Sequence, residues 1–170
     1  AEIVVANSTE FVKAAGGAAP RSLDDAVAPG RSLTGRAAVD ILDAQITARH
    51  LDLIARELKA ANKGFYTIAS TGHEGTAAVA PWLRATDLGF LHYRSGAFLA
   101  QHGKKIPGES QIYIVLLSLA AASEDPVSGG RHKVLGSKTQ WIPPQTSTIA
   151  SHLPKAFGFA YTLARLQRLG

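Results

Sequence analysis

The chain has 170 residues, of which 46% are hydrophobic and 18% are charged, and its formal net charge is +5. This length supports one well-buried core and is short for two domains, and the composition is that of a globular protein. The absence of cysteine excludes disulfides, a thiolate nucleophile and a cysteine-based metal site. The basic residues are scattered along the chain, so the positive charge does not indicate nucleic-acid binding.

Neither a membrane span nor a secretory signal is predicted. The longest apolar run, residues 112–122, is about half as long as a spanning helix requires. Glu2 and Glu10 interrupt the N-terminus before any long apolar stretch, unlike the order of a signal peptide. We therefore expect a cytoplasmic protein that does not associate with membranes.

The first half of the chain is predicted to begin with an arm and continue with a long helix. Gly16-Gly17 and Pro29-Gly30 break residues 1–33, which predicts an extended or partly disordered arm. From Thr34, a predicted N-cap, apolar residues recur at helical spacing. We expect this helix to stop at Gly64 in a left-handed conformation.

Short elements are predicted next. Residues 65–69 are typical of an extended segment, and residues 70–75 form a turn into a short helix that ends near Arg84. The Glu74 carboxylate is expected to accept backbone hydrogen bonds at the start of this helix, and a His73-Glu74 pair alone is too little for a metal site.

Two polar stretches, residues 92–96 and 145–150, look like halves of one anion-binding site. Residues 88–91 are predicted to form a short buried strand that ends just before Tyr93 and Arg94, and open α/β sheets bind ligands at the carboxyl ends of their strands. The second stretch, which contains Ser147, precedes the last predicted helix.

The second half of the chain is predicted to be mainly helical. Helices are expected over residues 96–102 and 109–122, followed by a loop over 123–130. Residues 142–145 are predicted to be irregular, because their two prolines exclude a central strand. A last helix over 149–169 is rich in small residues, which predicts a tightly packed, buried element.

These residues carry a resemblance to a known family. The stretches that carry it are GFYTIASTGHEGTAAVAPWLRATDLGFLHYRSGAFLA, GGRHKVLGSK and PQTSTIASHLPKAFGFAYTLA. Residues 34–170 resemble the alpha subunit of thiamine-diphosphate-dependent 2-oxo acid dehydrogenases, of the branched-chain (2-oxoisovalerate) or pyruvate type. The resemblance implies an α/β, thiamine-diphosphate-binding fold. This chain would hold its N-terminal, mostly helical portion with few short strands, and we expect a longer polypeptide.

The family's activity is oxidative decarboxylation of a 2-oxo acid, followed by transfer of the acyl group to a lipoyl arm. The resemblance therefore implies an oxidoreductase of branched-chain amino acid degradation with thiamine diphosphate as cofactor. It also implies a beta-type subunit or domain, a lipoyl-bearing acyltransferase core, and a heterotetramer or fused dimer. A non-catalytic helical scaffold or binding fragment without cofactor is the alternative.

The resemblance carries particular roles over to this chain. Tyr93 and Arg94 match a pair that contacts the diphosphate, which suits the planar fork of arginine. Ser147 and Ile149 match residues that support the middle of the cofactor. His132 matches a catalytic histidine near the reacting carbon, although its loop is shorter here. The alternatives are a core position for Tyr93, an N-cap for Ser147 and an exposed loop position for His132.

Metal ions are expected to lie mostly outside these residues. The family's Mg²⁺ ligands belong to a segment that would follow Gly170, so no metal ligand is predicted within the chain. Side chains at four positions fall where branched-chain members hold a structural K⁺, although a histidine replaces an amide at the last of them: Thr146, Thr148, Ser151 and His152.

Overall fold

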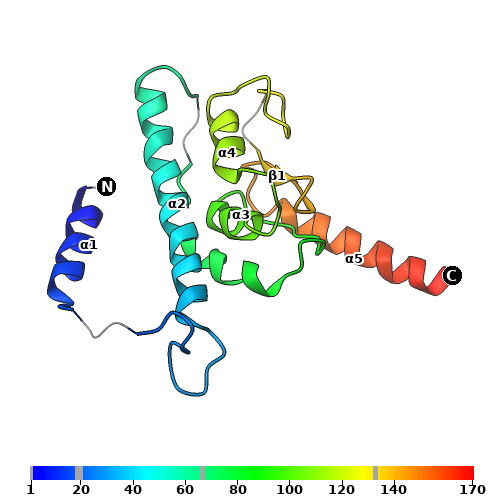
Figure 1. Ribbon diagram of the computed structural model, residues 1–170. Coiled ribbons are helices and arrows are strands. Elements are labelled where there is room, and N and C mark those ends of the chain that lie inside the picture. Colours follow the sequence, from blue (N-terminus) through cyan, green and yellow to red (C-terminus); the bar gives the residue numbers. More distant parts are fainter. Residues whose placement is uncertain (1, 18–20, 66–67, 132–133) are drawn as a thin grey trace. The chain divides into compact units, whose positions relative to one another are not determined.

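The computed structural model describes residues 2–17, 21–65, 68–131 and 134–170, and consists of helices and one small antiparallel sheet (Figure 1). This agrees with the predicted mixture of mostly helices and few short strands. The chain divides into two units, Ala1–Val39 and Asp40–Gly170. The predicted boundary lay at Thr34, whereas the division falls within a helix. The predicted site residues belong to the second unit.

The first unit contains a helix where the sequence predicted an extended or partly disordered arm. Helix α1 spans Glu2–Ala14, and its side chains Phe11 and Val12 are exposed. The glycines and prolines that motivated the prediction begin only after this helix, so they do not oppose it. Further along the unit, Asp24 pairs with Arg36 at 3.0 Å.

Helix α2 spans Gly35–Ala60 and begins as predicted. The Thr34 hydroxyl accepts a hydrogen bond from the Ala37 N–H at 3.2 Å, which is the geometry of an N-cap. Its end differs from the prediction, because Asn62 adopts the left-handed conformation with φ of 55° and Gly64 does not. Asparagine tolerates this region since its short polar side chain can bond locally.

Alanines and one leucine form the buried side of α2. Its buried residues are Ala44, Ala48, Leu51 and Ala55, whereas large apolar residues of the predicted helix are exposed: Val39, Leu42, Ile46 and Ile54. Ala44 and Ala48 pack against Ala77 and Ala97 in one core cluster. Because alanine side chains are small, the backbone of α2 can lie close to the segments that carry Ala77 and Ala97, and these contacts hold this face of the helix.

Helix α3, Gly96–Gly103, lies at the centre of the second unit (Figure 1). It packs against two short 3₁₀ helices, η1 (Glu74–Ala78) and η2 (Ala80–Trp82), and against α4 (Gln111–Leu119). The predicted helices over 96–102 and 109–122 are confirmed, with α4 shorter than expected. In place of one short helix ending near Arg84, the structure has the two 3₁₀ helices, which end at Trp82. Ser110 is the N-cap of α4, and its hydroxyl accepts from the Tyr113 N–H.

The sheet is a hairpin of β1 (Leu135–Ser137) and β2 (Ile142–Gln145). Leu135 pairs with Gln145 and Ser137 with Ile142, and the register shifts between the two pairs. The prediction of an irregular stretch at 142–145 is therefore wrong. The rule that prolines exclude a central strand still holds, because both strands of a two-stranded sheet are edge strands, which tolerate proline.

The other predicted extended segments are not strands. Residues 88–91 are irregular and are tied to the hairpin turn by the Gly89 N–H, which donates to the Trp141 carbonyl at 3.1 Å. Residues 65, 68 and 69 are also irregular, and residues 66 and 67 lie outside the described residues. Without a parallel sheet here, Tyr93 and Arg94 are placed by a turn that leads into α3.

Helix α5 spans His152–Leu169 and contradicts the prediction of a buried element. None of its residues is buried, and Phe157 is 73% exposed. The ring of Phe159 meets Phe90, with centroids 5.8 Å apart. Small residues permit close packing but do not enforce it. Across the described ranges, no helix has both the length and the apolar character needed to cross a membrane.

Candidate functional site

Tyr93 and Ser147, two of the predicted site residues, line one cavity. It has a volume of about 50 Å³ and lies among α4, β1 and the segments around Tyr93 and Gln145. Aliphatic side chains form most of its wall: Ile68, Leu99, Ile114, Val115, Val127, Val134 and Leu135. The two polar stretches singled out in the sequence therefore meet in space.

Arg94 lies beside this cavity and is held in place by its neighbours. Its Nη1 donates to the Ala69 carbonyl, and its guanidinium carbon lies 5.2 Å from the centre of the Tyr93 ring. The latter contact is within the range of a cation–π interaction. The Arg94 backbone N–H also donates to Nδ1 of His92 at 3.2 Å. These contacts keep the Tyr93 and Arg94 side chains together.

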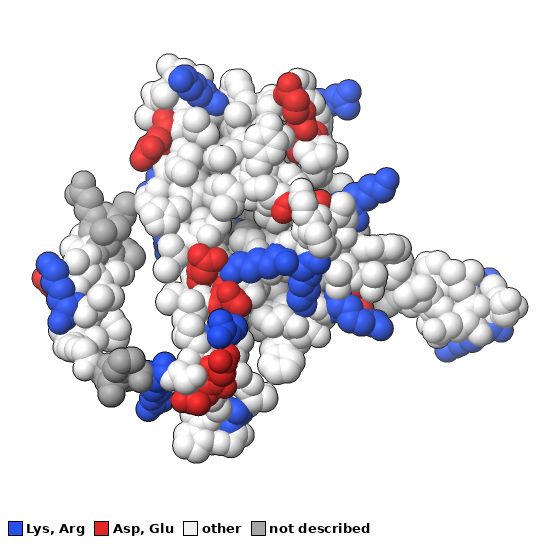
Figure 2. Space-filling model, in the orientation of Figure 1, with Lys and Arg blue, Asp and Glu red and all other residues white. Residues whose placement is uncertain are grey.

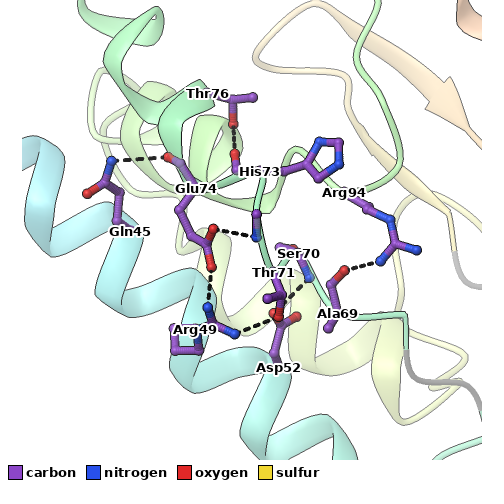
Figure 3. Close-up of polar contacts among 11 residues, drawn as sticks. Gln45, Arg49, Asp52, Ala69, Ser70, Thr71, His73, Glu74, Thr76 and Arg94 are labelled. Carbon is purple, nitrogen blue, oxygen red and sulfur yellow. Dashed lines mark hydrogen bonds and ion pairs between the residues drawn. The ribbon is translucent and has the colours of Figure 1, made fainter. Parts of the chain in front are cut away.

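The loop before η1 is fastened to α2 by polar contacts (Figure 3). Asp52 accepts from the Ser70 N–H at 2.7 Å, and Arg49 pairs with Glu74 at 2.7 Å. The other carboxylate oxygen of Glu74 accepts from the Gly72 N–H at 2.7 Å, so its predicted role at the helix start is confirmed. These bonds fix the loop that supplies the Ala69 carbonyl to Arg94.

The second polar stretch is organised around Gln145, which is 2% exposed. Its side-chain amide donates to the Thr146 carbonyl at 3.1 Å and to the Ser151 hydroxyl. Ser147 is partly buried and lines the cavity, whereas Ile149 is 78% exposed. The structure thus brings Tyr93 and Ser147 to one cavity, places Arg94 against the Tyr93 ring, and leaves Ile149 at the surface.

The predicted catalytic residue, His132, lies outside the described residues. Its neighbour in sequence, Arg131, is exposed, and Val134 and Leu135 line the cavity. The described chain therefore lies in the cavity wall from Val134 onward.

Sequence analysis missed three polar groups of the cavity wall. Gln111 and Ser118 lie on the same side of α4, two turns apart, and the buried atoms Gln111 Oε1 and Ser118 Oγ have no hydrogen-bond partner among the described residues. Asp125 is 3% exposed and accepts from the Val127 N–H at 3.0 Å and from the Ser128 hydroxyl at 2.6 Å. The sequence did contain a signal for the first two, because Gln111 and Ser118 are polar residues at helical spacing within the apolar sequence of α4.

Three histidines lie next to the cavity, and we call His73, His92 and His152 the histidine cluster. His92 belongs to the predicted stretch 92–96, whereas His73 and His152 were not predicted to bind an anion. The rings of His73 and His92 are stacked, with centroids 4.9 Å apart, and His152 meets His92 edge-on at 5.7 Å. Burial, followed by the charges of His73, His152 and Arg94, lowers the pKa of His92 from its ordinary value. His92 is therefore biased toward the neutral form.

The described residues do not form a metal centre. No group of three or more His, Cys, Asp or Glu side chains in the described ranges could hold a metal ion. At the positions considered for K⁺, the Thr146 hydroxyl donates to that of Thr148 at 3.2 Å, and the Ser151 hydroxyl accepts from Gln145. These oxygens are engaged with other side chains, and we derive no role for K⁺.

On the face drawn in Figure 2, positive and negative side chains are interspersed. One such pair joins α3 to α2, because Nζ of Lys104, which follows α3, lies 2.8 Å from the carboxylate of Asp43 on α2. In comparisons with known proteins, no family model matches the chain, and neither a curated protein nor a solved structure is significantly similar to it.

Proposed function

We propose that this chain is the diphosphate-binding part of the decarboxylating component of a 2-oxo acid dehydrogenase complex. The component would use thiamine diphosphate, act in the cytoplasm, and pass an acyl group to a lipoyl-bearing acyltransferase. The observation that carries the proposal is the meeting of Tyr93 and Ser147 at one cavity with Arg94 beside it. These three residues match the family's cofactor contacts, and Ser147 comes from a segment far from Tyr93 and Arg94 in the sequence.

The donors suit a diphosphate. Arg94 has a guanidinium whose planar fork forms paired, charge-assisted bonds with phosphate oxygens, and the hydroxyls of Tyr93 and Ser147 donate single bonds. The cavity of about 50 Å³ is much smaller than the roughly 300–1,000 Å³ typical of sites that enclose an organic ligand. The diphosphate would therefore bind at the mouth of the cavity, where Ser147 is partly exposed.

The rest of the active site would come from other segments. When bound, thiamine diphosphate supplies the electron sink for decarboxylation. Its Mg²⁺ would be held by residues beyond this stretch, and its pyrimidine ring by a beta-type subunit or domain. The tasks of this chain are to grip the diphosphate through Tyr93 and Arg94, and to place Ile149, which is exposed, against the cofactor. His132 would donate a proton at the reacting carbonyl.

Calorimetric titration with thiamine diphosphate and Mg²⁺ tests the proposal. It should be done on this chain, and on the longer polypeptide together with its beta-type partner. Arg94→Ala should weaken binding by about 1.5–3 kcal/mol, the worth of a hydrogen bond to a charged group, and Arg94→Lys should recover only part of this loss. The control is Arg56→Ala, because Arg56 is exposed on α2. Absence of binding by the assembled protein would favour the non-catalytic scaffold.

The substrate is proposed to be a branched-chain 2-oxo acid. Assays of the assembled protein with 2-oxoisovalerate and with pyruvate distinguish the two family types. A higher kcat/KM for pyruvate would contradict this choice and leave the cofactor assignment intact, because the two acids share the same decarboxylation chemistry.

A further inference from the structure

The histidine cluster gathers imidazoles from three separate segments. His73 precedes η1, His92 lies in the turn before α3, and His152 is the first residue of α5. All three are partly exposed, so a ligand can reach them. Figure 3 shows the His73 ring directed away from α2 and toward the segment that bears Arg94. The cluster therefore adjoins the proposed diphosphate contacts and extends them.

The electrostatic surroundings of the cluster favour an anion. The charged groups that act on His92 are His73, His152 and Arg94, and all of them are cationic or become so on protonation. The carboxylates of the adjoining elements have other partners: Glu74 pairs with Arg49 and accepts from the Gly72 N–H, and Asp52 accepts from the Ser70 N–H. Tyr93, whose ring is 4.0 Å from that of His92, contributes a neutral phenol.

A metal ion does not fit the same place. Two of the rings are parallel within 7°, so their nitrogens do not converge on one point, and the guanidinium of Arg94 repels a cation. Nδ1 of His152 is buried and has no hydrogen-bond partner among the described residues, so it is available to donate to an anion when it carries a proton. Imidazole nitrogens that carry protons donate well to phosphate oxygens.

We propose that His73, His92 and His152, together with Arg94, bind a phosphate-type oxyanion, and that uptake of protons by the imidazoles strengthens this binding. The inference rests on the proposed function only in naming the diphosphate of thiamine diphosphate as the natural oxyanion. Without an anion, the neighbouring cationic groups disfavour the imidazolium form of His92. A bound anion reverses that balance, so binding and protonation assist each other.

The first experiment measures the affinity of inorganic diphosphate by calorimetry at pH 6 and pH 8. The variant carries His73→Gln, His92→Gln and His152→Gln, because glutamine keeps a hydrogen-bonding side chain but does not titrate. The control is His50→Gln, since His50 is exposed on α2 and lies outside the cluster. The ligand's own protonation is common to all three proteins, so it cancels in the comparison.

We expect the pH 6 to pH 8 affinity ratio of the unmodified chain to exceed that of the triple variant by about threefold to tenfold. Tenfold is the limit for a rise of one unit in the pKa of one imidazole on binding, and it is approached only when that pKa lies between pH 6 and pH 8 in both states. The control should match the unmodified chain. Equal affinities and equal ratios in the triple variant and the control would overturn the inference.

Nuclear magnetic resonance of the unmodified chain provides a test that needs no variant. The ring-proton titrations of His73, His92 and His152 are followed with and without saturating inorganic diphosphate. We expect the midpoint of His92 to move to higher pH, while that of His50 stays in place. Unchanged midpoints for all three cluster residues would refute the inference, even if the triple variant fails to fold.

Further ligands separate this inference from the proposed function. Histidine-dependent binding of diphosphate or orthophosphate, with no gain for thiamine diphosphate and none for thiamine, supports the anion site and contradicts the cofactor assignment. If thiamine diphosphate binds tightly and with the same pH dependence in the triple variant, the result supports the cofactor assignment and contradicts the anion site at the histidines. Histidine-dependent binding that is tightest for thiamine diphosphate supports both.

Discussion

Removing the Asp52 carboxylate should loosen the loop that carries His73. Asp52 accepts from the N–H of Ser70, a residue that is 9% exposed, at 2.7 Å. A hydrogen bond to a charged group is worth about 1.5–3 kcal/mol, and the orphaned N–H would add to the loss. We therefore expect Asp52→Ala to lower the free energy of local opening by about 2 kcal/mol, which is roughly thirtyfold in the opening equilibrium.

Asp43→Ala is the matched control, because Asp43 lies on the same helix. Its salt bridge with Lys104 joins side chains that are 63% and 36% exposed, and such surface pairs are worth about 0.2–1 kcal/mol. Hydrogen exchange at the Ser70 amide measures opening directly. Exchange should accelerate in Asp52→Ala and stay unchanged in Asp43→Ala. Equal exchange rates in the two variants would refute the reasoning.

Three further predictions concern packing, a partly buried lysine and pH. Gly103→Ala should lower the free energy of unfolding in urea by about 1–3 kcal/mol, because a Cβ there would lie 2.3 Å from Cγ of Gln111. Gly158→Ala should be neutral or stabilising, because a Cβ at that position meets nothing within 4 Å. Similar urea midpoints for the two variants would contradict this reasoning. The Lys105 ammonium donates to the carbonyls of Ala80 at 2.8 Å, Pro81 at 3.1 Å and Leu83. Lys105→Met should therefore lower the melting temperature more than Lys104→Met does. The reverse order would show that the three bonds are dispensable. Burial and cationic neighbours lower the pKa of His92 in the folded state, so its contribution to stability is present above the ordinary pKa of 6.5 and is lost as the pH falls below it. The melting temperature of His92→Gln should therefore fall less between pH 7 and pH 5 than that of the unmodified chain. An equal fall in the two proteins would contradict the assignment of this pH dependence to His92.

Local signals in the sequence predicted the helices better than the strands. The Thr34 cap and the turn at Glu74 are set by residues a few positions apart, so the sequence reveals them. Residues 88–91 have strand-like composition but no neighbouring strand with which to form a ladder, and pairing is a property of two segments. The burial of α5 was inferred from its small residues, although burial depends on what packs against them.

Part of the candidate site was accessible from sequence, and part was not. Tyr93, Arg94 and Ser147 were found through a resemblance in motif order. His92 stood in the predicted stretch 92–96, but its grouping with His73 and His152 was missed, because the three residues are spread along the chain and neither periodicity nor spacing connects them. The buried bond between Nδ1 of His102 and the side chain of Gln140, at 3.1 Å, is another long-range contact of this kind.

The prolines of β2 limit what the hairpin can join. A strand that adds to a sheet needs N–H donors along the exposed edge, and Pro143 and Pro144 occupy half of β2 without offering any. The β2 edge therefore resists pairing with a strand of another molecule, which is how many edge strands avoid aggregation. The hairpin can hold Gln145 and Leu135 at the cavity without acting as a template for further strands.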